Sequence, residues 1–309
     1  MSLFTRNRAR SVASLGEEKL IAAIQKWLGT ASPRRPFGIG DDCAQLPASR
    51  RAQLITVDPV IAGRHFDDSV KPRDVGEKLL KRNLSDIAAM GGVPTAAVLA
   101  VSLDPRTNLI WLEAFYRGLA ACARRFGVAI VGGDLAQANA TFIASLTLLG
   151  TSTGSRVLTR EGAKLGDEIY VTGRLGGSLA SGHHYRFTPR LAEGAWLARQ
   201  RAVRSMMDVS DGLAKDIHAL TPKGTTASLD RASLPRRSGC TLRAALTEGE
   251  DYELLFTVAA KTHADTFARQ WHEQFPRTPL AHIGRFESKN AVTPGSIDLH
   301  SYHGYEHLR

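Results

Sequence analysis

Apolar residues recur along the first half of the chain at spacings that predict alternating helices and strands. Leu20, Ile24 and Leu28 repeat at every fourth position between 16 and 29, which places them on one face of a helix. The same spacing predicts helices over 74–89 and 108–125, and β-rich apolar runs predict strands over 53–57, 96–103, 128–131 and 141–149. We expect the first strand to end at Asp58-Pro59, where the residue before proline is extended. The third strand should close on Gly132-Gly133-Asp134.

A small, polar segment at 151–155 is the best linker candidate in the chain. Beyond it the pattern predicts strands at 168–172, 206–209, 226–229 and 253–258, and helices near 176–184, 190–200, 211–220 and 261–272. Both halves therefore mix helices and strands. We predict two domains of the α/β or α+β type, over 1–150 and 151–309.

Composition supports a folded protein of ordinary size. The chain has 309 residues, of which 43% are hydrophobic and 23% charged, and it contains no apolar run near the roughly 20 residues of a membrane span. The basic start of the chain precedes no apolar segment suited to a signal peptide, so we expect a cytoplasmic protein with no membrane partner. Cys43, Cys122 and Cys240 are widely spaced, which argues against a disulfide framework or a zinc site.

The net charge of +10 raises the question of a nucleic-acid partner. The basic residues, however, occur as scattered pairs such as Arg34-Arg35 and Arg124-Arg125, with no single stripe interleaved with aromatic residues. We therefore expect no nucleic-acid function. A general positive field that attracts small molecules carrying phosphate is the milder interpretation.

The positions of the carboxylates are more informative than their number. Six short segments place an acidic residue beside glycine or at the end of a predicted strand: Gly40-Asp41-Asp42, Thr56-Val57-Asp58, Asn83-Leu84-Ser85-Asp86, Gly132-Gly133-Asp134, Asp208-Val209-Ser210-Asp211-Gly212 and Gly249-Glu250-Asp251-Tyr252-Glu253. Glycine lets the backbone approach a ligand, and carboxylates are hard oxygen ligands for Mg²⁺ alongside nucleotide phosphates. Two carboxylates about 4 Å apart repel by roughly 4 kcal/mol at an effective dielectric of 20, so a cluster requires cations or protons.

Taken singly, each segment has a structural interpretation. Asp211-Gly212 can simply begin a helix, and Asp86 can lie on an exposed helical face. The chain contains neither a phosphate-binding loop of the G-x-x-x-x-G-K-[ST] type nor the H-R-D and D-F-G motifs of protein kinases. The hypothesis of a metal–phosphate site therefore depends on the segments acting together.

In order along the chain, these segments resemble the motifs of the thiamine-monophosphate kinase family. The resemblance runs from about Gly16 to the C-terminus, and several motifs recur across the wider superfamily of aminoimidazole ribonucleotide synthetase-like ATP enzymes. Further segments carry it, namely Ala62-Gly63-Arg64-His65-Phe66, Leu158-Thr159-Arg160, Val171-Thr172-Gly173 and Tyr302-His303-Gly304-Tyr305-Glu306-His307.

The resemblance implies a two-domain aminoimidazole ribonucleotide synthetase-like fold. Its N-terminal α/β domain pairs with its twin in a homodimer, and its C-terminal domain is α+β. It also implies ATP-dependent phosphorylation of thiamine monophosphate with several Mg²⁺ ions, by direct in-line transfer. On this basis Asp42 and Asp211 would be catalytic, and the metals would be held by Asp42, Thr56, Asp58, Asp86, Asp134, Asp208 and Asp211. Contacts to ATP would come from Gly133, Asp134, Arg160, Ser210 and Tyr116, and contacts to thiamine phosphate from His65, Glu250 and Tyr302.

The chain departs from the family pattern at a few positions. Val57 stands where a hydroxyl residue is usual, and Pro59 stands where threonine is usual. Gly177 replaces an acidic residue, Glu248 replaces a glycine, and Lys81-Arg82 replace small apolar residues. We expect these departures to affect substrate affinity more than chemistry. For His65 and Tyr302, orienting a loop and packing the tail are equally good interpretations.

Two alternatives to a thiamine-monophosphate kinase remain open from the sequence. The chain can be another ATP-using member of the superfamily, such as an aminoimidazole ribonucleotide synthetase. Selenophosphate synthetases and hydrogenase-maturation relatives fit less well, because the expected cysteines are missing before Asp41 and at the C-terminus. The second alternative is a nucleotide-binding regulator without catalysis, which the matched carboxylates disfavour.

Overall fold

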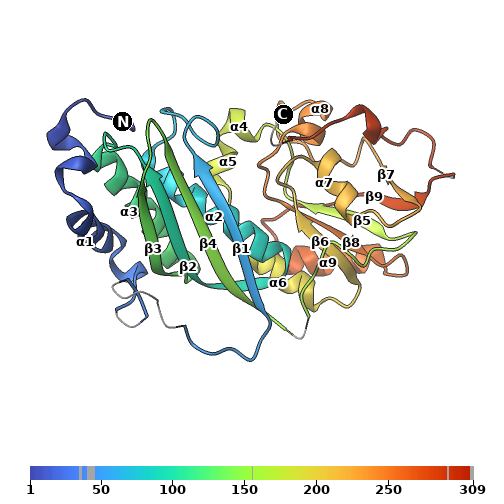
Figure 1. Ribbon diagram of the computed structural model, residues 1–309. Coiled ribbons are helices and arrows are strands. Elements are labelled where there is room, and N and C mark those ends of the chain that lie inside the picture. The colour runs from blue at the N-terminus through green and yellow to red at the C-terminus, as the bar shows by residue number, and fades with distance from the viewer. Residues whose placement is uncertain (35–36, 40–45, 155, 291, 307–309) are drawn as a thin grey trace. The chain divides into compact units, whose positions relative to one another are not determined.

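The computed structural model describes residues 1–34, 37–39, 46–154, 156–290 and 292–306 (Figure 1). The expected metal ligand Asp42 lies outside the described residues. The chain divides into two compact units: unit 1 holds Met1–Ile87 and Val93–Thr151, and unit 2 holds Ala88–Gly92 and Ser152–Arg309. The short segment Ala88–Gly92 thus belongs with unit 2, although its residue numbers lie in the range we assigned to the first domain.

Unit 1 is a four-stranded sheet with helices on one face (Figure 1). The strands lie in the order β1-β4-β2-β3; β1 and β4 are antiparallel, whereas β2 and β3 are parallel. On β4, buried residues alternate with half-buried ones, the period expected for a sheet covered on one side. The elements of this unit are α1 (Glu17–Leu28), β1 (Gln53–Ile61), α2 (Pro72–Ala89), β2 (Gly92–Leu103), α3 (Leu109–Phe126), β3 (Ala129–Gln137) and β4 (Phe142–Ser152).

Two strands of unit 1 run further than the sequence predicted. The prediction that β1 ends at Asp58-Pro59 was wrong, because the strand continues to Ile61 with Pro59 paired to Ser145. Proline is tolerated there because β1 is an edge strand, where no second neighbour needs its missing N–H. The expected close of β3 at 132–134 was also wrong: Gly133 and Asp134 continue the pairing with β2 to Gln137.

The helices α2 and α3 pack against each other through two glycines. A Cβ atom at Gly76 would lie 2.0 Å from the Phe115 carbonyl oxygen, and one at Gly118 would lie 2.0 Å from the Arg73 carbonyl oxygen. Any side chain at these positions would force the two backbones apart. Close packing of the two helices presents one continuous surface to the sheet, where Trp111 and Phe142 meet with ring centroids 4.9 Å apart.

Unit 2 is a five-stranded sheet in the order β6-β8-β5-β9-β7, with antiparallel pairing throughout. Its helix α8 (Leu242–Thr247) and its strand β9 (Leu280–Ser288) were not predicted from the sequence. The single helix predicted near 176–184 is divided into two short helices, α4 (Ser178–Ser181) and α5 (His183–Arg186). The other elements match predicted ones within a few residues: β5 (Glu168–Thr172), α6 (Leu191–Arg199), β6 (Val203–Asp208), α7 (Leu213–Leu220), β7 (Thr225–Leu229), β8 (Leu254–Val258) and α9 (Ala264–Gln274).

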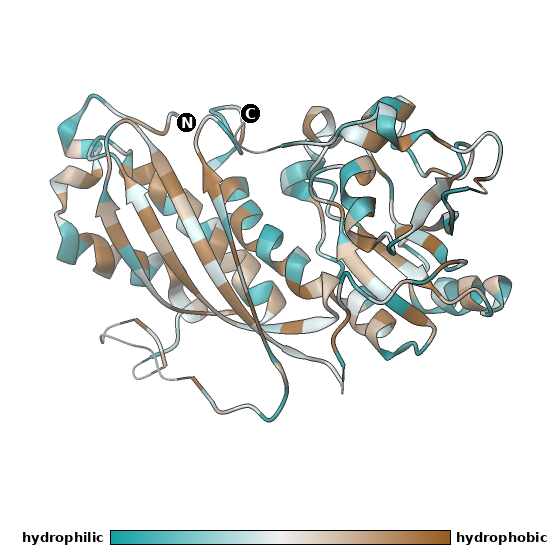
Figure 2. Cartoon of the chain, turned by 45° about the vertical axis from the view of Figure 1, so that its right-hand side comes forward, coloured by the Kyte–Doolittle hydropathy of each residue, from teal (hydrophilic) through white to brown (hydrophobic). Residues whose placement is uncertain are grey.

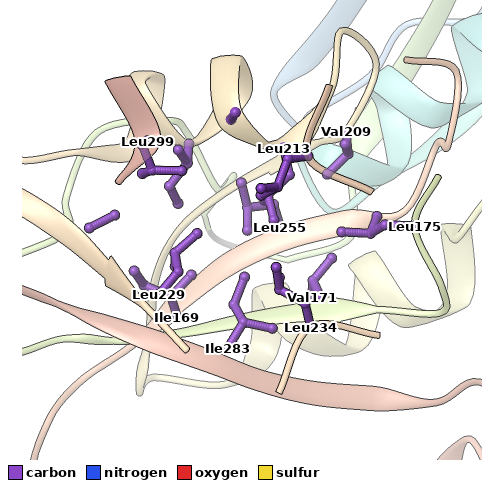
Figure 3. Close-up of a cluster of buried hydrophobic side chains, with 14 of the residues drawn as sticks. Ile169, Val171, Leu175, Val209, Leu213, Leu229, Leu234, Leu255, Ile283 and Leu299 are labelled. Carbon is purple, nitrogen blue, oxygen red and sulfur yellow. The ribbon is translucent and has the colours of Figure 1, made fainter. Parts of the chain in front are cut away.

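Both faces of the unit 2 sheet are buried, each in its own core. Ile169 and Val171 of β5 point into a cluster that includes Leu213 of α7 (Figure 3). Tyr170, between them in sequence, points into the opposite cluster with Trp271 of α9. Successive residues of a strand face opposite sides, so the apolar run of β5 serves both cores. In Figure 2 the strands of this unit mix brown, pale and teal segments.

Among the residues described, no helix combines the length and the apolar character required to cross a membrane.

Candidate active site

In unit 1, β1 and α2 bring two of the expected metal ligands into contact. The Thr56 hydroxyl donates a hydrogen bond to the Asp86 carboxylate, with 2.5 Å between Oγ1 and Oδ2. Asp86 is half-buried, so the interpretation that it lies on an exposed face of the helix was wrong. The sequence separates these residues by 30 positions, and the packing of α2 on the sheet brings them together. The result is a pair of hard oxygen donors on the helix-covered face of β1.

Asp58 lies on the same face of β1, two residues beyond Thr56. Its carboxylate forms an ion pair with Arg82 of α2, with 3.2 Å between Oδ1 and the guanidinium nitrogen. The same guanidinium also donates a hydrogen bond to the Pro59 carbonyl. Arg82 is one of the departures from the family pattern, and it therefore contacts one of the expected metal ligands directly.

His65 orients the loop that follows β1. Its Nδ1 accepts a hydrogen bond from the Ile61 N–H at 3.1 Å, and its carbonyl accepts one from the buried Lys78 ammonium at 2.8 Å. These contacts fit the interpretation of His65 as a residue that orients a loop, and its expected contact to substrate stays a prediction.

Three of the expected nucleotide contacts line a single pocket of about 100 Å³ in unit 1. Gly133 and Asp134 of β3 form one wall and Tyr116 of α3 another, with Ile24 of α1 nearby. Burial raises the pKa of the Tyr116 hydroxyl, so this group stays protonated. Gly133 also has a packing role, because a Cβ there would lie 2.2 Å from the Leu99 carbonyl oxygen of β2.

In unit 2, the two acidic motifs lie side by side. Asp208 ends β6, and the loop after it is joined to the segment before β8 by backbone hydrogen bonds. The Glu250 N–H donates to the Ser210 carbonyl and the Tyr252 N–H to the Val209 carbonyl, both at 2.8 Å. The sequence predicted that these motifs act together, and within this unit the fold places them in direct contact.

Asp216 of α7 holds the loop that carries Ser210 and Asp211. Its carboxylate accepts hydrogen bonds from the backbone N–H groups of both residues, at 2.9 and 3.0 Å. Burial raises the pKa of Asp216 to about 7. Sequence reasoning missed this residue, because an aspartate inside a helical pattern is normally solvated.

The C-terminal tail is attached to the same loop. Lys215 contacts both the Asp211 carboxylate and the Tyr305 carbonyl, each at 2.6 Å, and the Tyr305 N–H donates to the Asp211 carbonyl at 2.8 Å. Gly304 is required for this approach, since a Cβ there would lie 2.5 Å from the Asp211 carbonyl oxygen. Tyr302 packs against the core beside α7, which fits its interpretation as an anchor of the tail.

Glu250, an expected substrate contact, is held from two sides. The Tyr252 hydroxyl donates to its Oε1 at 3.3 Å, and Nδ1 of the buried His184 lies 3.5 Å from Oε2. Glu250 and Tyr252 both have positive φ, 64° and 53°, which is strained for residues with a side chain. The sequence assigned no role to His184, and no local pattern marks its contact with Glu250.

Two half-buried arginines anchor the rest of this motif. Asp251 is fully buried, pairs with Arg237 and accepts the Gly176 N–H at 2.9 Å; burial raises the pKa of this carboxyl to about 6. Arg190 donates two hydrogen bonds of 2.7 Å to the Glu253 carboxylate. These pairs fix the backbone on either side of Tyr252, whereas the expected nucleotide contact Arg160 is exposed.

Two of the departures from the family pattern contact each other. Gly177 stands where an acidic residue is usual, and Glu248 stands where glycine is usual. The Gly177 N–H donates a hydrogen bond to the Glu248 carboxylate at 2.5 Å. The Glu248 side chain thus places a carboxylate next to position 177, where the family usually has an acidic residue. Val57 lies on the opposite face of β1 from Asp58 and is 60% exposed. A hydroxyl at position 57 would therefore point away from the carboxylates of β1.

The donor chemistry of these residues fits Mg²⁺. Threonine and aspartate oxygens are the hard ligands that Mg²⁺ takes, usually one or two carboxylates together with phosphate oxygens and water. In the part of the chain that the structure describes, which leaves out Asp41 and Asp42, no group of three or more His, Cys, Asp or Glu residues is arranged to hold an ion.

Comparison with known proteins decides the family. Residues 40–152 match the AIR synthase related protein, N-terminal domain, family. The chain is 34% identical to the thiamine-monophosphate kinase of Salmonella typhimurium over 324 residues, which covers 95% of this chain and 98% of the relative. The chain belongs to the thiamine-monophosphate kinase family.

Solved structures of thiamine-monophosphate kinases share the fold. The enzyme from Stenotrophomonas maltophilia K279a matches with a TM-score of 0.74 at 32% identity, over 91% of this chain and 98% of that one. A structure of AaThiL complexed with AMPPCP and TMP matches with a TM-score of 0.70 at 28% identity, over 99% and 100% of the two chains. The predicted aminoimidazole ribonucleotide synthetase-like fold of this thiamine-monophosphate kinase relative is thereby confirmed.

Proposed function

We propose that this chain transfers the γ-phosphoryl group of ATP to thiamine monophosphate, forming thiamine diphosphate and ADP. The observation that carries the proposal is similarity to thiamine-monophosphate kinases along 95% of the chain. The AaThiL structure with AMPPCP and TMP adds that a protein of the same fold is complexed with an ATP analogue and TMP. A cytoplasmic location stays a prediction.

In unit 1, the proposed nucleotide contacts Gly133, Asp134 and Tyr116 line one pocket together with apolar residues such as Ile24 and Ile130. In unit 2, the proposed nucleotide contacts are Arg160, which is an exposed cation, and Ser210, which lies in the loop fixed by Asp216.

The carboxylates hold Mg²⁺ in this proposal. Bound Mg²⁺ neutralises negative charge on the phosphate oxygens of ATP and the acceptor. Asp208 acts from the end of β6, and Asp211 acts from the loop whose backbone Asp216 holds. Thr56 and Asp86 act as a pair. The full set of proposed ligands is Asp42, Thr56, Asp58, Asp86, Asp134, Asp208 and Asp211.

The reaction requires positioning more than proton transfer. A phosphate oxygen of thiamine monophosphate is already anionic at neutral pH, so it attacks the γ-phosphorus in line without a strong general base. The remaining task is to hold the two phosphates in line and to exclude water, which pre-arranged groups achieve without reorganisation. His65, Glu250 and Tyr302 are the proposed contacts to the thiamine phosphate.

The open face of the unit 1 sheet is the proposed dimer surface, with a second copy of this chain as its occupant. Ile55 and Val57 are 71% and 60% exposed, and Val93 and Val98 also expose much of their side chains. An uncovered apolar sheet face of this kind marks an interaction site. The family resemblance independently implies pairing of this domain with its twin.

Light scattering after size exclusion tests the dimer. We expect the chain to elute as a dimer, and Val57→Glu to elute as a monomer, because a charge would be buried unpaired in the interface. Leu179→Glu in unit 2 is the matched control, since Leu179 is equally exposed at 63%. A dimer that survives Val57→Glu, or a wild-type monomer, would overturn this part of the proposal.

Turnover of thiamine monophosphate with Mg-ATP tests the activity. We expect thiamine diphosphate from the wild type and a loss of several orders of magnitude in turnover for Asp211→Asn, with the fold intact. Asp265→Asn, at an exposed position of α9, is the control and should leave turnover unchanged. Near-normal turnover in Asp211→Asn would refute the metal assignment, and ATP binding without product would favour the non-catalytic regulator.

A further inference from the structure

Arg82 is a half-buried cation beside a proposed metal ligand. Only 11% of its side chain is exposed, and its guanidinium contacts the Asp58 carboxylate at 3.2 Å and the Pro59 carbonyl. A guanidinium cannot lose its proton at any accessible pH, so this positive charge is permanent. Asp58 therefore has a counter-cation that the protein itself supplies.

The helical spacing of α2 places this cation beside the Thr56–Asp86 pair. Arg82 and Asp86 are four residues apart and thus lie on one face of the helix. That face meets β1, where Asp58 contacts Arg82 and Thr56 contacts Asp86. Thr56 and Asp58 are two positions apart on the strand, so their side chains share a face roughly 7 Å apart. The cation and the two carboxylates consequently form one compact group.

Arg82 contacts the Oδ1 atom of Asp58, so a metal ion that binds this oxygen must displace the guanidinium. An ion that binds there must break an ion pair in a site of low exposure, where such pairs are screened little by solvent. Without an ion, Arg82 already supplies positive charge beside the carboxylates. The substitution of small apolar residues by Lys81-Arg82 thus changes the electrostatics of the proposed metal site.

We propose that Arg82 is a resident counter-cation of Asp58 that lowers the affinity of this carboxylate for a divalent ion, and supplies part of the positive charge that the ion would bring. This inference rests on the proposed function, in which Asp58 holds Mg²⁺. Arg82 is a positioning residue in this account, since it acts through Asp58.

Divalent-ion binding, measured without turnover, tests the proposal. Mn²⁺ is titrated by electron paramagnetic resonance into the full chain, with and without AMPPCP. Arg82→Gln removes the charge and keeps a donor for the Pro59 carbonyl, whereas Arg82→Lys keeps the charge. We expect Arg82→Gln to bind Mn²⁺ about tenfold more tightly, or to bind one additional ion, because removing a nearby like charge favours a cation. Arg82→Lys should resemble the wild type.

Two further variants assign the effect to its site. Arg73→Met removes an arginine from the same helix whose side chain is 62% exposed, and it should leave Mn²⁺ binding unchanged. Adding Asp58→Asn to Arg82→Gln should abolish the gain. Circular dichroism verifies the fold of each variant, and Arg82→Met replaces Arg82→Gln if the latter does not fold.

The outcomes separate this inference from the proposed function. Wild-type Mn²⁺ affinity and stoichiometry in folded Arg82→Gln would overturn the role of Arg82, even if the wild type phosphorylates thiamine monophosphate. A gain in Mn²⁺ binding that persists after Asp58→Asn would also overturn it. If the gain depends on Asp58 but the wild type forms no thiamine diphosphate, the counter-cation stands and the proposed substrate is wrong.

Discussion

Removing the Asp216 side chain should disable the Asp211 loop without unfolding unit 2. The carboxylate accepts backbone hydrogen bonds of 2.9 and 3.0 Å from Ser210 and Asp211, and Asp216→Ala leaves both donors without this acceptor. At about 1 kcal/mol for each hydrogen bond and a little for lost burial, we expect the free energy of unfolding to fall by about 2–3 kcal/mol.

The effect on the activation free energy should be about as large as the effect on stability. The loop carries Asp211, and a displacement of about 1 Å in a positioned group costs roughly 100-fold in rate. Asp216→Asn is the matched control, because its amide oxygen can accept the same two hydrogen bonds. We expect Asp216→Ala to lose about 100-fold in kcat and Asp216→Asn less than tenfold.

Urea unfolding and a coupled ADP assay measure both quantities on the same preparations. Saturating thiamine monophosphate and Mg-ATP ensure that kcat, and not affinity, is compared. If Asp216→Ala retains wild-type kcat and stability, the loop is fixed by other contacts. If Asp216→Asn is as impaired as Asp216→Ala, the hydrogen bonds to Ser210 and Asp211 are not the reason for the effect.

Three further predictions test other parts of the structure. Gly118→Ala should destabilise unit 1 by about 1–3 kcal/mol in urea unfolding, because the added methyl group forces α3 away from α2. Hydrogen bonds from Arg106 lower the pKa of Asp104, so this carboxylate stabilises the fold above its unfolded pKa of 3.8 and loses that contribution as pH falls. Asp104→Asn should therefore be less stable than the wild type at pH 7 by about 1–3 kcal/mol. The difference in unfolding free energy between the two proteins should narrow in unfolding curves near pH 3. Trp271→Phe loses the donor to the Thr278 carbonyl at 2.8 Å, and should lower the unfolding free energy by about 1–3 kcal/mol in thermal denaturation.

The sequence predicted most helices and strands because their apolar periodicity matches what the two cores bury. The helix expected over 108–125 is α3, which begins after the Asn108 cap and ends at Gly127 in a left-handed conformation. The sequence misjudged β1 and β3, where proline and glycine normally end a strand. Whether a strand tolerates proline or glycine depends on the order of strands in the sheet. Pro59 lies on an edge strand, and Gly133 lies close to the backbone of the neighbouring strand β2. Sheet order is a long-range property that local patterns do not contain.

The site was predicted as a set of residue types but not as a set of contacts. The acidic motifs were identified in order, and the contacts of Glu250 with the Ser210 loop fit a common role. The groups that hold them were missed. His184 and Asp216 occur in ordinary helical contexts, and Arg82 looked only like a departure from a pattern. Each of these residues contacts a partner that is distant in the chain, or faces inward because of the helix that carries it. Only the fold reveals such contacts.

Transfer of the label of γ-labelled ATP is the decisive test of the kinase activity. The purified chain is incubated with Mg-ATP labelled at the γ-phosphate and with thiamine monophosphate, and the products are separated. We expect labelled thiamine diphosphate, one ADP for each molecule formed, and no label on the protein. Release of labelled inorganic phosphate without thiamine diphosphate, or ATP that remains intact, would contradict it.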